Sequence, residues 1–197
     1  MRIPLTKYGW PEVAIFPIIL LAAIIIYPLV AKGFLPLVFI ISTESLFILL
    51  LIWILCFFRD PARQVLEDKT VLLAPADGKI TDIEIVKEDN FIGIDALRIG
   101  IFMSIFDVHI NRSPCAAKVE NKLNHSGKYK IAKNPACSQV NHSNDLWLIR
   151  LDEPNDKLIL RQISGYLARR IVCPLVKGQI LTGGEKFGMI KFGSRTE

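Results

Sequence analysis

The sequence predicts a mainly β soluble domain, an antiparallel barrel or sandwich, on an N-terminal two-helix transmembrane hairpin. The first observation behind this prediction is that apolar residues concentrate before Arg59, in two runs long enough to cross a membrane as helices. The second is that the rest of the chain holds short stretches of partly alternating apolar and polar residues, separated by turn residues, which is typical of strands. We therefore expect a membrane anchor over residues 1–58 and a β-rich domain over residues 59–197.

The anchor is predicted from two apolar runs at about 13–31 and 35–58. Each has roughly 20 residues, which lets a helix cross the roughly 30 Å of hydrocarbon in a bilayer. The pair is not a cleavable signal peptide, because a second run follows the first and no small-residue cleavage site lies between them. Tyr8 and Trp10, just before the first run, suit the membrane interface. The alternative is a buried helical pair in a soluble core.

Basic residues predict the orientation of the hairpin. Arg2 and Lys7 precede it, and Arg59 and Arg63 follow it. Lys32 alone lies in its turn, so the positive-inside rule places both chain ends and the β domain on the cytoplasmic side of the cell (inner) membrane. The formal charge of +5 includes no long basic run, so we expect no nucleic acid as a partner and a weak attraction to anionic lipid instead.

The soluble part begins where Pro61 and the charges around it end the second apolar run. An Asp-Gly pair indicates a turn at residues 76–79, and the Asn-, Ser- and Lys-rich residues 124–145 indicate a long polar loop of the kind that forms lids or binding loops. Residues 107–114 have loop character, and residues 165–172 are predicted to form a helical or bent segment. The expected strands are residues 80–86, 97–106, 118–123, 146–151, 158–163 and 187–192.

The candidate chemistry lies at the Gly193-Ser194 bond, just after the last predicted strand. Glycine tolerates strained backbone geometry and the close approach of a neighbour, and Ser194 places a hydroxyl beside the preceding carbonyl. A serine next to an activating base is the general recipe for a nucleophile, and the candidate partners are His109 and Asp77. The alternative is a serine in a turn, a structural histidine and a turn aspartate, and spacing alone leaves both interpretations open.

Patterns for metal or disulfide chemistry are missing from the sequence. The three histidines are isolated, and the four cysteines show neither a CxxC pair nor metal-ligand spacing. We therefore expect no metal site, and we interpret the cysteines as free thiols in a reducing compartment. The sequence assigns no role to Glu44, inside the second apolar run, or to His125 and His142, which we expect to be solvated in the polar loop.

Five short motifs occur in order along the chain: FRDPAR at residues 58–63, APADGK at 74–79, FDVHINRSP at 106–114, ARRIVC at 168–173 and GEKFGMIKFGSR at 184–195. With this order, the chain resembles the short, bacterial and archaeal type of phosphatidylserine decarboxylase over nearly its whole length, the hairpin included. The ordered set carries the resemblance, since each motif is too short to carry it alone.

The resemblance implies a self-cleaving, pyruvoyl-dependent carboxy-lyase. In the family, the proenzyme cuts itself between the residues that match Gly193 and Ser194, through an ester made by the serine hydroxyl, and the serine becomes a pyruvoyl ketone. By similarity, His109 activates Ser194, and Asp77 orients and charges His109. The ketone forms a Schiff base with the amine of phosphatidylserine and accepts electrons as carbon dioxide leaves, which yields phosphatidylethanolamine at the membrane surface.

The partners that the resemblance implies are the phospholipid substrate, the membrane and a small subunit made by the self-cleavage, and a homodimer is left open. Candidate contacts to the headgroup phosphate are Arg59, Arg63, Arg169 and Arg170. In the family the chain continues for some tens of residues past the serine, so we expect this sequence to be truncated at its C-terminal end. The longer family branch also has a second histidine in the loop that here contains His109 alone.

Two alternatives to this function remain at the level of the sequence. Residues 75–79 and the glycine-rich last hairpin are also similar to the biotinyl or lipoyl-type barrels of membrane-anchored adaptor proteins that lack catalysis, but no Met-Lys-Met carrier lysine is present. An inactive homologue of the decarboxylases is the other alternative, and the early end of the chain is what favours it.

Overall fold

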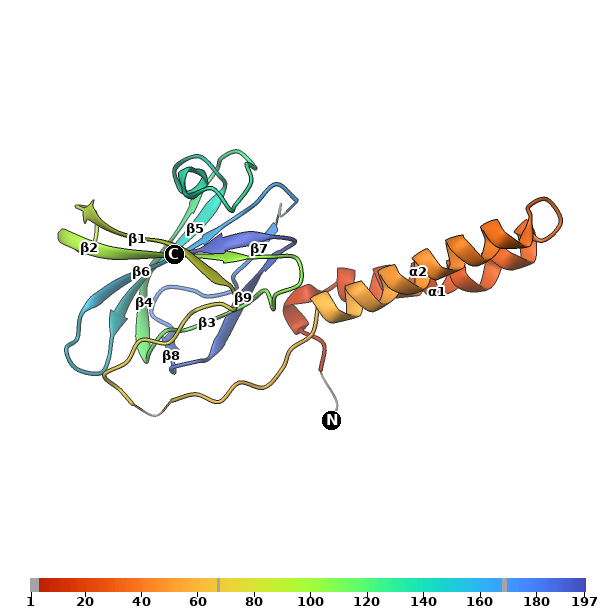
Figure 1. Cartoon of the computed structure of the whole chain (residues 1–197). Helices are drawn as coiled ribbons and strands as arrows, with labels where there is room; N and C mark the ends of the chain where they lie inside the picture. Colours follow the sequence, from red (N-terminus) through yellow and green to blue (C-terminus); the bar gives the residue numbers. More distant parts are fainter. Residues whose placement is uncertain (1–3, 67, 168–169) are drawn as a thin grey trace. The chain divides into compact units, whose positions relative to one another are not determined.

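The computed structural model divides the chain into two compact units, residues 1–61 and residues 62–197 (Figure 1). It describes residues 4–66, 68–167 and 170–197. The first unit is a helical hairpin, and the second is built of β-strands. This is the predicted fold class, a β domain joined to an N-terminal pair of helices.

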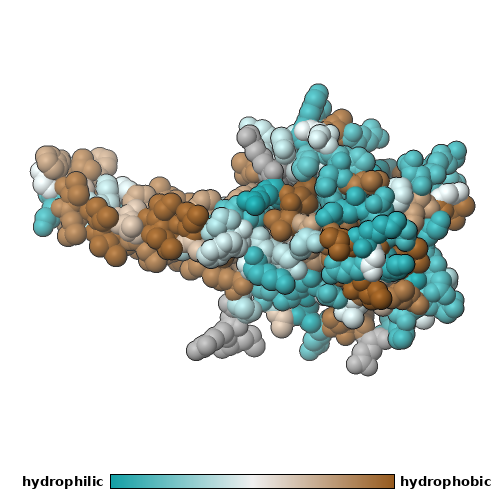
Figure 2. All heavy atoms as spheres, turned by 180° about the vertical axis from the view of Figure 1, so that it is seen from behind, coloured by the Kyte–Doolittle hydropathy of each residue, from teal (hydrophilic) through white to brown (hydrophobic). Residues whose placement is uncertain are grey.

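The hairpin consists of a short 3-10 turn, η1 (Lys7–Gly9), and two long helices, α1 (Glu12–Ala31) and α2 (Leu37–Phe57). Both long helices have the length and apolar composition needed to cross a membrane. Figure 2 shows hydrophobic residues over most of the hairpin surface. Because such a surface is stable in lipid and unfavourable in water, the hairpin has the character of a membrane anchor.

The two helices are joined at several points along the hairpin. The Tyr27 hydroxyl donates to Thr43 Oγ1 at 3.3 Å, and the Tyr27 ring meets the Phe47 ring edge-on at 5.8 Å between centroids. At the base, the Thr6 backbone N–H donates to the carbonyl of Phe58, which is fully buried. The short segment before α1 is therefore fixed to the end of α2.

The β domain contains two antiparallel sheets. The larger sheet has seven strands in the order β1-β2-β10-β6-β5-β4-β8, and the smaller has three in the order β3-β9-β7. The strands are β1 (Lys79–Glu88), β2 (Ile94–Met103), β3 (Ile110–Arg112), β4 (Ala117–His125), β5 (Ser143–Arg150), β6 (Lys157–Ile163), β7 (Arg170–Val172), β8 (Ile180–Leu181), β9 (Lys186–Lys191) and β10 (Ser194–Thr196).

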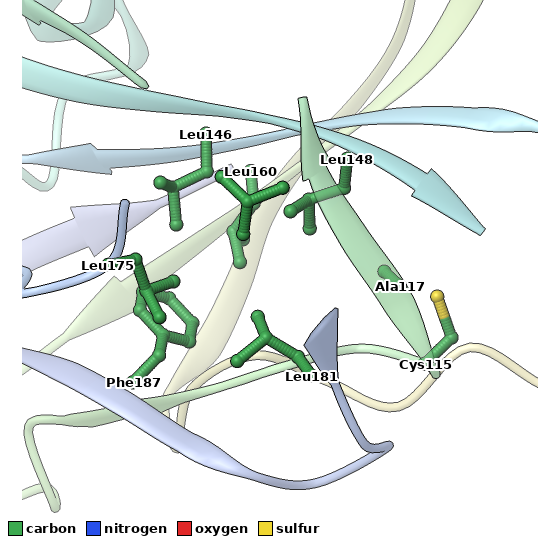
Figure 3. Close-up of a cluster of buried hydrophobic side chains, with 9 residues drawn as sticks. Cys115, Ala117, Leu146, Leu148, Leu160, Leu175, Leu181 and Phe187 are labelled. Carbon is green, nitrogen blue, oxygen red and sulfur yellow. The ribbon is translucent and has the colours of Figure 1, made fainter. Parts of the chain in front are cut away.

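A hydrophobic core joins the two sheets (Figure 3). Leu146 and Leu148 are fully buried on β5, whereas Trp147 between them is only partly buried, which is the alternation expected of a strand with one face in the core. Phe187 on β9 of the small sheet packs into the same cluster. The core cluster is made of Cys115, Ala117, Val119, Leu146, Leu148, Leu160, Leu175, Leu181 and Phe187.

Three local predictions need correction. Residues 110–112, predicted as loop, form β3, and part of the segment predicted as helical or bent, residues 165–172, forms β7. Both strands have only three residues, too few to show alternation, and each is stabilised by pairing with β9. The long loop predicted at 124–145 is shorter, because residues 124–125 end β4 and residues 143–145 begin β5. The loop contains a 3-10 turn, η2 (Pro135–Gln139), with Asn134 capping its first turn.

Candidate active site

The Gly193-Ser194 bond lies where the chain crosses from one sheet to the other. β9 of the small sheet ends at Lys191, and β10 of the large sheet begins at Ser194. The two linking residues, Phe192 and Gly193, both have positive φ angles, 71° and 72°. That conformation is unfavourable for a bulky side chain such as phenylalanine, so the backbone just before the bond is strained.

His109 lies directly beside this strained turn. Its ring is fully buried, and its Nε2 accepts a hydrogen bond from the Gly193 N–H at 3.1 Å. Its Nδ1 lies 2.9 Å from the carbonyl oxygen of Asp107, and because a carbonyl only accepts, Nδ1 carries the proton. The histidine is therefore neutral, with the lone pair of Nε2 directed at the residue before Ser194.

A compact turn between β2 and β3 holds His109 in this place. The Asp107 carboxylate accepts from the Ser104 backbone N–H at 2.7 Å, and the Asp107 N–H donates to the Ser104 carbonyl at 3.0 Å. This turn fixes the Asp107 carbonyl that orients the imidazole, so the orientation of the ring depends on backbone geometry.

Ser194 is fully buried, and its hydroxyl has a weak partner. The Oγ donates to the thioether sulfur of Met103 at 3.3 Å, and the Thr196 hydroxyl donates to the same sulfur at 3.5 Å. A thioether is a poor acceptor, so the serine hydroxyl loses little when it turns toward the Gly193 carbonyl. The contact with Met103 keeps the hydroxyl away from water without holding it firmly.

The other side of the scissile bond is closed by Gly165, which sequence reasoning did not select. A Cβ atom at this position would overlap the Gly193 carbonyl oxygen, so a glycine is needed for the close approach. The preceding residue, Ser164, is fixed in turn: its carbonyl accepts from the buried Asn141 side chain at 2.8 Å, and its hydroxyl donates to the His142 carbonyl at 2.8 Å. The polar loop therefore supports the wall of the site.

Arg195, directly after Ser194, is the second residue that the sequence did not reveal. Its guanidinium is fully buried on the large sheet. It donates from Nη2 to the Asp82 carboxylate at 2.5 and 2.6 Å, from Nη1 to the Thr81 hydroxyl at 2.7 Å, and from Nε to Glu197 at 2.7 Å. A Cβ atom at Gly100 would overlap the guanidinium, so β2 is shaped to receive it.

Asp82 and Arg195 each stabilise the charged form of the other. Burial raises the pKa of Asp82, but hydrogen bonds from Arg195 and Thr81 outweigh it, and the pKa of the carboxyl is lowered. Burial lowers the pKa of Arg195, and the hydrogen bonds to Asp82 and Glu197 raise it by more. Both groups are therefore charged, and the residue that follows Ser194 is held by a buried ion pair.

Asp77, predicted to orient His109, forms an ion pair with Arg63. Both side chains are about two-fifths exposed, at 40% and 43%. The turn that carries Asp77 lies against β2 and β3, since the Arg112 N–H donates to the Pro75 carbonyl at 2.9 Å. The structure thus brings together His109, Gly193 and Ser194, and it gives the Asp77 carboxylate a basic partner at the surface of the domain.

The candidate headgroup arginines differ in their local surroundings. Arg59 Nη1 donates to the carbonyl of Cys56 at 2.7 Å, at the end of α2. Arg63 is taken up by the ion pair with Asp77, and Arg170 begins β7. Arg169 lies outside the described residues.

The remaining histidines, His125 and His142, hydrogen-bond within the domain, and the cysteines are unpaired thiols. His125, expected to be solvated, is half exposed, and its Nε2 lies 3.2 Å from the Asp145 carboxylate, which also binds Arg161. His142 Nδ1 lies 3.0 Å from the His125 carbonyl. The four cysteines are free thiols, and among the described residues no three His, Cys, Asp or Glu side chains gather as metal ligands.

Comparisons with known proteins give one consistent result. A family model for phosphatidylserine decarboxylase matches residues 50–197. The phosphatidylserine decarboxylase proenzyme of Carboxydothermus hydrogenoformans is 40% identical over 149 residues, which cover 76% of this chain and 68% of the relative. The proenzyme of Prosthecochloris aestuarii is 40% identical over 164 residues, 83% of this chain and 73% of the relative. That of Chlorobium limicola is 38% identical over 196 residues, 98% of this chain and 87% of the relative.

Proposed function

The chain belongs to the phosphatidylserine decarboxylase family, and we propose that it is a proenzyme that cuts itself at Gly193-Ser194 and then converts phosphatidylserine to phosphatidylethanolamine and carbon dioxide at a membrane surface. Membership of the family makes it a carboxy-lyase, which favours the enzyme over the adaptor alternative. The observation that carries the self-cleavage is the 3.1 Å contact between His109 Nε2 and the Gly193 N–H on a strained turn.

The proposed first step uses three groups. The Ser194 hydroxyl turns from Met103 to the Gly193 carbonyl carbon, and its proton passes to His109 Nε2, which exchanges its hydrogen bond from the Gly193 N–H for one from the hydroxyl. The protonated imidazole then returns the proton to the Ser194 nitrogen as the peptide C–N bond breaks. The Gly193 acyl group is thereby moved from nitrogen to oxygen, and the strain at Phe192 favours its departure from the amide.

The second step removes the ester. A base takes the Ser194 Cα proton, the C–O bond breaks, and the Gly193 carboxylate leaves with the bonding electrons. The resulting dehydroalanine tautomerises to an imine, and water hydrolyses it to a ketone and ammonia. We assign this proton transfer to His109, and its burial beside residue 193 supports the assignment.

The residues around Ser194 fit a reactive ketone in that position. A pyruvoyl group supplies an electron sink for the loss of a carboxylate. Ser194 is fully buried between Met103 and the His109 turn, which shields such a group from water until substrate enters. Arg195 holds the segment that carries it, and His109 is available to protonate the product. The two membrane-length helices support a lipid substrate, since a two-tailed lipid stays in the bilayer.

Intact mass measurement of the full chain tests the proposal. We expect a break between Gly193 and Ser194, with a carbonyl-blocked fragment that reacts with a hydrazine. Ser194→Ala is expected to stay uncut, and the exposed Ser126→Ala is the matched control that is expected to be cut normally. A chain that stays whole yet releases carbon dioxide from phosphatidylserine contradicts the mechanism, and a chain that is neither cut nor active supports the inactive homologue.

A further inference from the structure

Three loops of the β domain meet at the scissile bond. The Ile105 side chain, in the loop between β2 and β3, lies 3.6 Å from the position of a Cβ at Gly193. Gly165, between β6 and β7, lies against the Gly193 carbonyl, and a Cβ at Gly165 would be 3.2 Å from Ala132 in the loop between β4 and β5. The last two loops lie side by side in Figure 1.

Each of these loops exposes a large apolar side chain next to its contact at the site. Phe106 follows Ile105 and is 69% exposed. Ile131 precedes the buried Ala132 and is 65% exposed. Tyr166 and Leu167 follow Gly165 and are 65% and 62% exposed. We call these four residues, Phe106, Ile131, Tyr166 and Leu167, the apolar rim.

The loop between β4 and β5, which carries Ile131, is positively charged. Residues 126–142 contain Lys128, Lys130 and Lys133, all exposed, and no aspartate or glutamate. Exposed apolar tips flanked by lysines are the pattern of a surface that enters the interface of an anionic bilayer, because the apolar tips enter the acyl boundary and the lysines meet the lipid phosphates. The same chain carries two helices of membrane-spanning length, which keep the β domain within reach of a bilayer.

We propose that the apolar rim is a membrane-docking surface, which brings the Ser194 site to the headgroup layer of an anionic bilayer. The inference rests on the proposed function, since a lipid whose tails stay in the bilayer reaches a buried Ser194 only when the site lies against the lipid surface. Hydrogen bonds hold the loops that carry the rim residues. The Asn141 side-chain amide donates to the Ser164 carbonyl and to the Lys130 carbonyl, at 2.8 Å each.

The docking is tested without catalysis, in the uncleavable Ser194→Ala full chain. An environment-sensitive fluorophore is attached at Leu167→Cys, with Cys56 and Cys173 replaced by serine, and the protein is placed in vesicles of phosphatidylcholine and phosphatidylglycerol. The matched control is the same label at Ile85→Cys, an exposed apolar residue on β1, outside the three loops of the rim. We expect quenching by spin-labelled phospholipid at position 167 and at most weak quenching at position 85. Equal quenching at both positions, or none at 167, overturns the proposal.

A second experiment links the apolar rim to turnover. For Leu167→Asp and Ile131→Asp, we expect self-cleavage to continue and the ratio of turnover on vesicle phosphatidylserine to turnover on a short-chain, water-soluble phosphatidylserine to fall at least about tenfold. Ile85→Asp is expected to leave this ratio unchanged. Equal loss on both substrates overturns the proposal, because the rim then belongs to the reaction site. A protein inactive on both substrates from the start contradicts the proposed function, and the quenching result still decides the docking.

Discussion

Replacing Asp82 by asparagine tests how strongly the buried ion pair holds the residue after Ser194. Asp82 is 10% exposed and Arg195 is not exposed at all, so screening by water is slight. Removing one partner of a buried pair costs about 3–5 kcal/mol, because the other charge is left in a low-dielectric environment. Arg195 keeps its bonds to Glu197 and Thr81, so we expect the lower end, about 3 kcal/mol. For a domain of this size that is a fall in Tm of about 10 °C.

The second variant, Arg195→Met, makes the test specific. It leaves the carboxylates of Asp82 and Glu197 buried without their cation, so we expect a loss of about 4–5 kcal/mol. Adding Asp82→Asn to Arg195→Met removes one of those carboxylates and is expected to restore at least about 1 kcal/mol. The same substitution therefore destabilises the wild-type chain and stabilises the Arg195→Met chain.

The assay is thermal unfolding of the full chain in detergent, followed by the circular dichroism of the β-sheet at one scan rate. The pH dependence adds a check: since the pKa of Asp82 is lowered in the fold, its contribution is present above about pH 4 and is lost as the pH falls through the lowered pKa. That acid-side loss is expected to disappear in Asp82→Asn. If Asp82→Asn shifts Tm by the same amount in the wild-type and Arg195→Met chains, the ion-pair reasoning is refuted.

Three further predictions concern the walls of the site and the core. His109→Gln is expected to slow self-cleavage at least about 100-fold, measured by intact mass over time, while the circular dichroism stays unchanged. Gly165→Ala is expected to reduce the cut fraction because its methyl overlaps the Gly193 carbonyl, whereas Gly183→Ala, with its nearest neighbour at 3.7 Å, is the control expected to be cut normally. Burial raises the pKa of the Cys115 thiol from 9.0 to about 11. The contribution of Cys115 to stability is therefore expected to be complete below pH 9 and to be lost as the pH rises toward 11. The measurement is Tm against pH, and an unchanged Tm in this range contradicts the burial argument.

The parts of the fold that were predictable are those with long, regular patterns. The two helices were visible because an unbroken apolar run of membrane length is rare in a soluble domain. The longer strands of the large sheet could be predicted because one face of each strand is more buried than the other, as at the buried Leu146 and the partly buried Trp147. β3 and β7 have no such pattern, because each has three residues and is stabilised by pairing with a later strand, β9.

The site also contains residues that could be predicted from the sequence and residues that could not. His109 and Ser194 were selected because their side chains carry recognisable chemistry, and the structure places His109 against Gly193. Gly165 and Arg195 were missed because their roles depend on what surrounds them: a glycine is needed where the Gly193 carbonyl approaches, and an arginine is buried where Asp82 meets it. The partner of the Asp77 carboxylate was not predictable either, because the basic residue that pairs with it, Arg63, belongs to a segment without regular structure.

The crossing between the sheets explains how a chain can be cut at this point and stay folded. On one side of the bond, β9 remains paired with β3 and β7. On the other side, β10 remains paired with β2 and β6, and Arg195 stays locked to Asp82. Of the two residues between the strands, Phe192 is strained and Gly193 tolerates its positive φ, and neither belongs to a sheet. The proposed cleavage therefore falls between the two sets of strand pairs and frees the strained Phe192, so we expect residue 194 to keep its position beside Met103 after the bond is gone.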